Sequence, residues 1–404
     1  MVVGWVTANV APSTVQYGTA SNSYSQTATG TVDFYKYSAL YTSGQIHHAT
    51  LTGLKPSTVY YYKVAGAAAE YNFTSSPGVG AFYPYKIGFF ADIGESLNAD
   101  DTVLHMLAGS RSIDSYVLNG DISYASGCES RGCATWDAFQ RMMSPLAATK
   151  PIAINIGKCG SPRGAPGGAA RAPARPPAAR ALTAPPPTPP SPSHEVADDA
   201  NGIPAISARY RFAGMPTGGR ADQSYYFSYE AGPAHVISIS SFYFGGYGAG
   251  SALTKWLVAD LASIDRAKTP WVLVSLHAPW YNSNSAHQGD GEGMRVALEA
   301  VLVKAGVAAV FSGHVHAYER SFVVNNKQVV ADGAGMVHFN IGDAGAGLYT
   351  TWSHVTATSA FHSAVFGHGE FEIVNATHAH WTWHRNQDNE AVVADSVFVV
   401  NPAV

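Results

Sequence analysis

His314 and His316 stand two residues apart, directly after an apolar run from Val307 to Phe311. At the end of a strand, this spacing can direct both imidazoles to one metal cluster, because side chains two residues apart lie on the same face. A single His-x-His pair is weak evidence, since many such pairs are surface residues. Its value depends on further ligand types at other strand ends.

Ligand-type residues follow three other apolar runs. Asp92 follows IGFFA, Asp121 and Tyr124 follow SYVLNG, and His277 follows WVLVSL. One such residue alone is explained equally well as the cap of the next helix. Separate strand ends of one sheet converge on one crevice, so the set favours a shared site. Glycines beside both aspartates permit the sharp turns that would aim the carboxylates at metals.

The ligand types indicate which metals such a site would hold. A mixture of Asp, His and Tyr without Cys suits hard or borderline ions, and a phenolate favours a strongly Lewis-acidic trivalent ion such as Fe(III). We therefore expect a coloured, iron-containing protein.

The segments around these residues predict two architectures. Residues 1 to about 75 show short alternating runs between Gly and Pro turns, which is typical of an all-β sandwich. From KIGFFADIG onward, apolar strands alternate with helical stretches near Asp101 to Leu107 and Trp136 to Met143. This βαβαβ order predicts a largely parallel core sheet with loops at the carboxyl ends of its strands. Further strands are expected at HVISISS, TPWVLVSLHAPW, GVAAVFSGHVH and MVHFNIGDAG.

Composition narrows the class of protein. The 404 residues are 46% hydrophobic and 13% charged, which suits a globular chain of two or three domains. A net charge of −4 without a basic run provides no footprint for nucleic acid. We see no apolar stretch long enough for a bilayer span, and we expect neither nucleic acid nor membrane as a partner. A homodimer is the candidate assembly.

Four fragments, DIG, GDISY, VSLH and GHVH, resemble in order and spacing the signature blocks of the purple acid phosphatases, a branch of the binuclear metallophosphoesterases. The segment GQIHHATLTGLKPSTVYYYKV is similar to the fibronectin-III-like domain of the large plant-type members, and VNATHAHWTWHRNQD to their C-terminal end. The resemblance implies a fibronectin-III-like domain over residues 1–78. It implies an α/β metallophosphoesterase domain over residues 85–404, with mixed sheets packed as a sandwich between helices.

The resemblance divides the predicted ligands between two metals joined by a carboxylate: Fe(III) bound by Asp92, Tyr124 and His316, a divalent Zn, Mn or Fe bound by His277 and His314, and Asp121 as the bridge. It implies an acid phosphatase in which a metal-activated hydroxide attacks small-molecule phosphate monoesters. A general metallophosphoesterase that cleaves diesters or pyrophosphate is the alternative. An inactive product whose sandwich serves as an interaction module is a third possibility.

Two catalytic histidines follow from the same resemblance. His194 would contact the substrate, and His287 would help to protonate the leaving group. The family often has two adjacent histidines at the second place, whereas Ala286 precedes His287 here. A solvated loop residue is therefore the alternative interpretation of His287, and His47 with His48 is more simply structural or surface.

Residues 158–193 interrupt the fourth block of the family. That block reads Gly-Asn-His-Glu, but Gly157 is followed here by Lys158, and His194 with Glu195 resumes only after residue 193. The intervening run contains 11 prolines and no aromatic residue, so we expect a disordered insert. As written, the divalent site lacks an uncharged oxygen ligand. We therefore expect weak occupancy of this site and low activity.

Secretion is expected from three further features. The sequons Asn72-Phe73-Thr74 and Asn375-Ala376-Thr377 would suit a glycoprotein, and Cys128 and Cys133 in a tight loop are either a disulfide pair or free thiols. The run MVVGWVT at the start reads as a strand, so a leader peptide is expected to be missing from this chain.

We predict that residues 158–193 are a retained intron. If Lys158 is encoded by AAG, Cys159 begins with T and Ser193 is AGC, joining AA to C restores an asparagine codon and the block Gly-Asn-His-Glu. Sequencing of the transcript across codons 157 to 194 should give a shorter product in the same frame. A main product with the full run would instead establish a genuine Pro/Ala-rich insertion.

Overall fold

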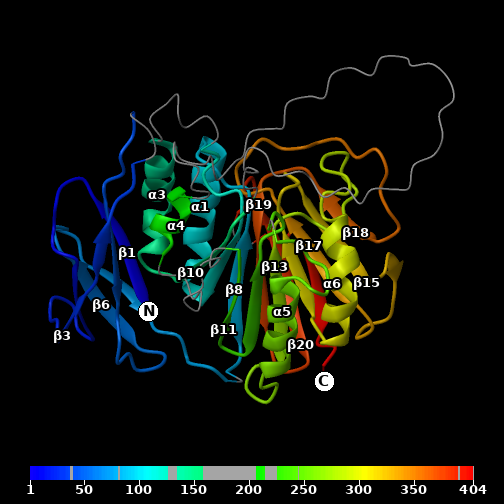
Figure 1. Ribbon diagram of the computed structural model, residues 1–404, viewed down its shortest axis with the longest axis horizontal. Coiled ribbons are helices and arrows are strands. Elements are labelled where there is room, and N and C mark those ends of the chain that lie inside the picture. Colours follow the sequence, from blue (N-terminus) through cyan, green and yellow to red (C-terminus); the bar gives the residue numbers. More distant parts are fainter. Residues whose placement is uncertain are drawn as a thin grey trace.

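The computed structural model describes residues 1–36, 40–80, 82–125, 134–157, 206–213, 225–243, 245–389 and 392–403. The predicted insert, His194, Cys128 and Cys133 lie outside these ranges. Figure 1 shows the N-terminal strands at one side of the molecule and a larger body of strands and helices beside them. No helix in the described ranges is long and apolar enough to cross a membrane.

The N-terminal domain is the predicted β-sandwich. Its two antiparallel sheets have the strand orders β1-β5-β4 and β3-β2-β6-β7. The strands are β1 (Val2–Thr7), β2 (Thr14–Gly18), β3 (Gln26–Thr29), β4 (Thr31–Asp33), β5 (Gln45–Thr50), β6 (Val59–Val64) and β7 (Tyr71–Thr74). His47 is fully buried here, between the hydroxyl groups of Thr7 and Ser13 at 2.8 Å each, as expected of a structural histidine.

A six-stranded mixed sheet begins the second domain, in the order β10-β9-β8-β19-β20-β21. Strands β8, β9 and β10 are parallel, as predicted, and the C-terminal strands continue the sheet in antiparallel pairing. The bounds are β8 (Tyr85–Phe90), β9 (Ser115–Asn119), β10 (Ile152–Asn155), β19 (Gly367–Ile373), β20 (His378–Arg385) and β21 (Asp395–Val400).

The second sheet of this domain has eight strands in the order β11-β12-β13-β14-β17-β15-β16, with β18 paired to β15. Strands β12, β13, β14 and β17 are parallel neighbours. The bounds are β11 (Tyr226–Ala231), β12 (Ala234–Ile239), β13 (Trp271–Leu276), β14 (Ala309–Ser312), β15 (Tyr318–Asn325), β16 (Gln328–Val329), β17 (Met336–Ile341) and β18 (Ser359–Ser363).

Helices cover both outer faces of the paired sheets (Figure 1). One cluster of buried side chains joins α1, α3 and α4 to the six-stranded sheet, and another joins α5 and α6 to the eight-stranded sheet. The helices are α1 (Leu97–Gly109), η1 (Ser110–Ser112), α3 (Ala134–Ala147), α4 (Ile206–Arg211), α5 (Ala252–Ser263) and α6 (Glu292–Lys304). The expected sandwich of mixed sheets between helices is confirmed.

Aromatic side chains fill the layer between the two sheets. Phe89 of β8 stacks on Phe311 of β14 with ring centroids 3.7 Å apart, and Phe339 packs on Trp381 at 4.3 Å. All four rings are buried. Close-packed contacts of this kind hold the carboxyl ends of β8 and β14 at one rim of the sandwich.

Arg211 joins the two domains. Its buried guanidinium donates to the hydroxyl groups of Tyr35 and Tyr41 in the N-terminal domain, at 3.1 and 2.7 Å, and to Asp137 of α3 at 2.7 Å. Because a buried charge without partners is costly, this set of contacts fixes α4 against both neighbours.

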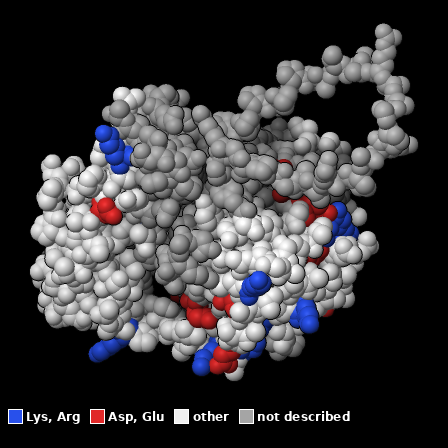
Figure 2. Space-filling model, in the orientation of Figure 1, with Lys and Arg blue, Asp and Glu red and all other residues white. Residues whose placement is uncertain are grey.

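Charged side chains on the face drawn in Figure 2 are scattered, and blue and red groups are intermixed toward one end of the described surface.

The buried ring of His235 lies between two carboxylates. Nδ1 is 2.9 Å from Glu230 Oε1, and Nε2 is 3.0 Å from Asp260 Oδ2. Burial alone would lower the pKa of His235, but the hydrogen bonds to Asp260 and Glu230 outweigh it and raise the pKa to about 9.

The raised pKa of His235 predicts how the free energy of unfolding depends on pH. A folded-state pKa above the unfolded value means that its contribution is full below about pH 6.5 and is lost as the pH rises through about 9. We expect denaturant titrations to show a fall in the free energy of unfolding over this window. His235→Asn should flatten the fall, and His378→Asn, which changes an exposed histidine, should preserve it. A fall that survives His235→Asn would contradict the assignment.

Candidate metal centre

All six predicted ligands meet at the carboxyl ends of strands from both sheets. The six-stranded sheet presents Asp92 after β8 and Asp121 and Tyr124 after β9, and the eight-stranded sheet presents His277 after β13 and His314 and His316 after β14. Asp92, Asp121 and His277 are fully buried, and His314 is 1% exposed. The sandwich therefore brings both sets of strand ends to one place.

The backbone at these positions is strained. Nine non-glycine residues in the described ranges have positive φ, and five of them belong to this region, with φ between 45° and 69°: Asp92, Asp121, Tyr124, His287 and His314. A left-handed conformation at such residues costs of order 1–3 kcal/mol each and persists only where the surroundings enforce it. Its concentration here is evidence for a functional site.

The side chains form two groups that share one carboxylate. The ligand atoms of Asp121, His277 and His314 lie within 4.8 Å of one another, and so do those of Asp92, Asp121 and His316. Tyr124 belongs to the second group, because its hydroxyl is 2.9 Å from Asp92 Oδ1 and 2.8 Å from His316 Nε2. This arrangement has the form of two adjacent cation sites with Asp121 between them.

Backbone carbonyls orient two of the imidazoles. Nδ1 of His277 lies 2.7 Å from the carbonyl of Asn119, and Nδ1 of His316 lies 2.6 Å from that of Gly347. A carbonyl oxygen only accepts, so each Nδ1 carries the proton. Nε2 is left facing a carboxylate: His277 Nε2 is 3.1 Å from Asp121, and His316 Nε2 is 3.4 Å from Asp92. Such outer contacts fix the tautomer of a metal ligand.

The electrostatics fit a pair of cations. Burial lowers the pKa of His314 to about 4, against the opposing hydrogen bond to Asp290. Burial, with Asp92 and Asp121, raises the pKa of Tyr124 well above its usual value. Two buried carboxylates beside three imidazoles and a phenol offer oxygen and nitrogen donors to hard or borderline ions, and positive charge would favour the ligating form of every group.

Two glycines leave room for this packing. A Cβ at Gly313 would collide with Asp92 Oδ2 and with Ala91, and a Cβ at Gly120 would come within 2.6 Å of His277 Nδ1. Gly120 also has a φ of 85°, which a side chain would disfavour. Gly120, which was expected to permit a turn beside Asp121, is therefore a close-contact position as well, and Gly313 is a second such position before His314.

His287, the predicted proton donor, lies at the rim of the centre. Its ring is 3.8 Å from that of His314, between centroids, and its Nε2 is 3.3 Å from the hydroxyl of Tyr349. The side chain is 23% exposed, and its role as proton donor stays a prediction. The other predicted catalytic residue, His194, lies outside the described residues.

Two neighbours of the centre were missed in the sequence. Asp290 Oδ2 is 2.9 Å from His314 Nε2, and Tyr349 stacks on His316 with ring centroids 4.4 Å apart. The only signal for Asp290 was its position three residues after His287, which a tight turn would bring back to that ring.

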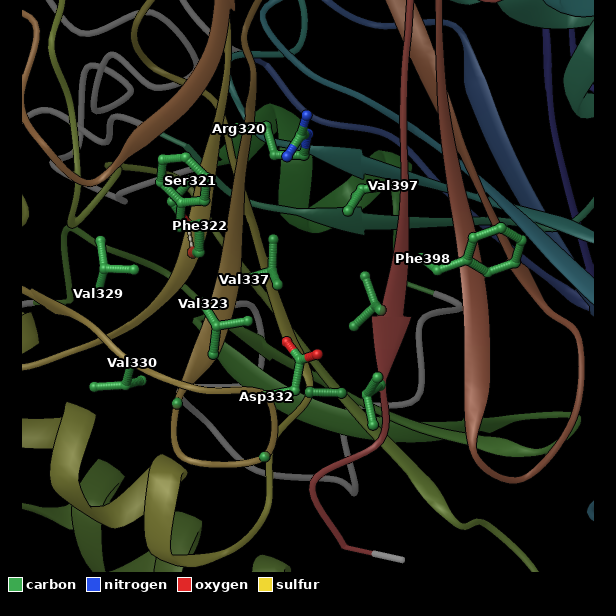
Figure 3. A pocket seen from close by; sticks show the side chains of 15 residues that line it. Arg320, Ser321, Phe322, Val323, Val329, Val330, Asp332, Val337, Val397 and Phe398 are labelled. Atoms are coloured by element: carbon green, nitrogen blue, oxygen red, sulfur yellow. Dashed lines mark hydrogen bonds between the residues drawn. The ribbon is translucent and has the colours of Figure 1, made fainter.

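A separate hollow of about 180 Å³ lies between β15, β17 and β21 (Figure 3). Its lining is mainly apolar, from Phe322, Val323, Val397 and neighbouring side chains, with Asp332 as its carboxylate. Arg320 at its wall is already paired with Asp395 at 2.7 and 2.8 Å. None of the predicted metal ligands lines this hollow, so it is not the metal centre.

Comparisons with known proteins agree with this geometry. Residues 85–318 match the calcineurin-like phosphoesterase model, residues 1–76 match the N-terminal domain of purple acid phosphatase, and residues 335–396 match iron/zinc purple acid phosphatase-like protein C. Fold and ligand arrangement thus define a metallophosphoesterase.

Similar curated proteins narrow the class further. "Probable purple acid phosphatase 20" of Arabidopsis thaliana is 35% identical over 413 residues, which cover 99% of this chain and 85% of the relative. "Purple acid phosphatase" of Glycine max is 31% identical over 99% of this chain and 82% of its own length. The chain belongs to the purple acid phosphatase family.

A solved structure shares the fold. Purple acid phosphatase PPD1 from seeds of yellow lupin (Lupinus luteus) superposes with a TM-score of 0.79 at 20% identity, over 98% of this chain and 71% of that one.

The glycine contacts give a test of the centre. Gly313→Ala should displace the carboxylate of Asp92 and lower the amount of tightly bound metal, measured by elemental analysis after dialysis. Gly293→Ala is the matched control, because a Cβ there meets open space. An alanine at position 313 that leaves metal content at the control level would contradict the packing described.

Proposed function

We propose that this protein is an acid phosphatase that hydrolyses small-molecule phosphate monoesters at a binuclear Fe(III)–M(II) centre. The observation that carries the proposal is the pair of ligand groups joined by Asp121, with a phenol in one group only. A phenolate favours a trivalent ion, whereas imidazole suits a divalent Zn, Mn or Fe. Names of relatives support the reaction, since an Allium cepa protein 31% identical to this chain is called "Phosphoenolpyruvate phosphatase".

The ligand roles proposed are those expected from the sequence: Asp92, Tyr124 and His316 for Fe(III), His277 and His314 for the divalent ion, and Asp121 as the bridge. When bound, such ions supply Lewis acidity and lower the pKa of water so that a nucleophile exists at acid pH. The buried position of these groups keeps competing bulk water away from the reacting phosphate.

His287 is the proposed proton donor to the leaving alkoxide. Nδ1 faces the carboxylate of Asp290 at 3.1 Å, which leaves Nε2, on the side of Tyr349, to deliver the proton. His194 is the proposed contact to the substrate phosphate, and it remains a sequence-based prediction. The same holds for the domain limits 1–78 and 85–404 and for the homodimer.

Secretion and N-glycosylation are also proposed. Asn72 on β7 and Asn375 in the turn between β19 and β20 are both exposed, so each sequon is accessible. The exposure of both asparagines supports N-glycosylation, and glycosylation would accompany secretion of the protein.

Colour and reaction together test the function. The iron-loaded chain should absorb visible light through Tyr124, and at acid pH it should hydrolyse p-nitrophenyl phosphate faster than bis(p-nitrophenyl) phosphate. Tyr124→Phe should lose the visible band and roughly tenfold or more of the monoesterase activity.

Tyr349→Phe is the control for these changes, because its ring also stacks in the centre but is assigned no metal. This variant should keep the band. A colourless wild-type chain with confirmed bound iron would contradict the role of Tyr124, and a preference for the diester would favour the general metallophosphoesterase.

A further inference from the structure

Asp290 lies between two imidazoles at the rim of the metal centre. A single oxygen, Oδ2, is 2.9 Å from Nε2 of His314 and 3.1 Å from Nδ1 of His287. The two rings are inclined by 39° with centroids 3.8 Å apart. One carboxylate therefore accepts hydrogen bonds from the buried ligand candidate and from the proposed proton donor.

A tight turn brings the carboxylate back to these rings. The amide of Asp290 lies 3.3 Å from the carbonyl of His287, and that of Glu292 lies 3.0 Å from the carbonyl of Gly289. His287 and Gly289 have φ values of 54° and 81°. A strained histidine is not needed merely to enter helix α6, so the turn serves the placement of Asp290 and His287.

The contact with Asp290 decides which nitrogen of His314 carries the proton. His314 is 1% exposed, and its Nε2 faces the carboxylate of Asp290. When Nε2–H donates to Asp290, Nδ1 keeps the lone pair that a metal beside Asp121 and His277 requires. Asp290 thus performs for His314 the task that the carbonyls of Asn119 and Gly347 perform for the other two imidazoles.

A simple surface ion pair does not account for this arrangement. The side chain of Asp290 is 41% exposed, and exposed pairs contribute about 0–1 kcal/mol to stability. Its partners are the buried ring of His314 and the partly buried ring of His287, and both residues have positive φ, so the effect of the carboxylate falls on their orientation rather than on folding.

We propose that Asp290 is a positioning residue that fixes the tautomer of His314 for metal binding and couples this ring to His287. The part that concerns His287 rests on the proposed phosphatase function, and the part that concerns His314 does not.

The first experiment is independent of activity and of metal. The full chain, freed of metal and labelled with ¹⁵N-histidine, should show His314 protonated at Nε2, assigned by comparison with His314→Gln. Asp290→Ala should lose this preference, and Asp290→Glu should restore it. Glu292→Ala, which removes a carboxylate two residues away that binds Arg295 and Lys327, should change nothing. An unchanged tautomer in Asp290→Ala would overturn the proposal.

The second experiment concerns metal and reaction. Asp290→Ala should bind Zn²⁺ about 10–100-fold more weakly, as expected for loss of an outer partner, with unchanged thermal stability. It should also slow hydrolysis of an alkyl phosphate more than that of p-nitrophenyl phosphate, because only the alkoxide needs full protonation on leaving.

The outcomes separate the two proposals. If the wild-type chain hydrolyses neither ester although two equivalents of metal are bound, the phosphatase function fails, while the tautomer still decides the role of Asp290. His287, Asp290 and His314 also have ligand atoms within 4.8 Å of one another. Loss of one whole equivalent of bound Zn²⁺ in Asp290→Ala would mean that Asp290 is itself a ligand, and would overturn the positioning role.

Discussion

The burial of two carboxylates, Asp92 and Asp121, at the ends of adjacent parallel strands is the constraint on which the rest of the structure depends. Withdrawing an ionised carboxylate from water costs several kcal/mol even after relaxation, and two of them side by side also repel each other. Their surroundings reduce this cost: the amide of His314 donates to Asp92 at 2.7 Å, the hydroxyl of Tyr124 does so at 2.9 Å, and His277 lies 3.1 Å from Asp121. The imidazoles, the close glycine contacts and the left-handed turns all help to hold these two carboxylates in place.

Much of the fold could be predicted because its signals are local. Apolar runs that end in Asp or His gave the parallel strands β8, β9, β13 and β14, and alternating runs gave the N-terminal sandwich. Pairing across the chain was not visible in this way. Strand β19 lies beside β8, so that Lys86 binds Glu370 across 284 residues of sequence, and only the folded layers bring such partners together. The aromatic stack of Phe89 and Phe311 is likewise a product of two sheets meeting.

The site likewise contains residues that the sequence predicts and contacts that only the fold creates. Ligand types at strand ends are visible in the sequence, so the six residues that lie together in the site could be predicted. Asp290 carries only its spacing of three residues from His287, because an acidic residue in a glycine-rich loop otherwise resembles any surface carboxylate, and its role depends on the turn at His287. The tautomers of His277 and His316 depend on the carbonyls of Asn119 and Gly347, which every residue type possesses. Hydrogen bonds to backbone carbonyls therefore cannot be predicted from the types of the side chains.

Because β8 lies between β9 and β19 in its sheet, its two edges are covered at different times during synthesis. Asp92 emerges from the ribosome early, on a strand that can pair at once with β9 but whose opposite edge stays bare until β19 has been made. An open edge beside an incomplete aromatic layer is prone to pair with other chains. A nascent or prematurely released chain that lacks β19 would therefore expose this edge to chaperones and proteases.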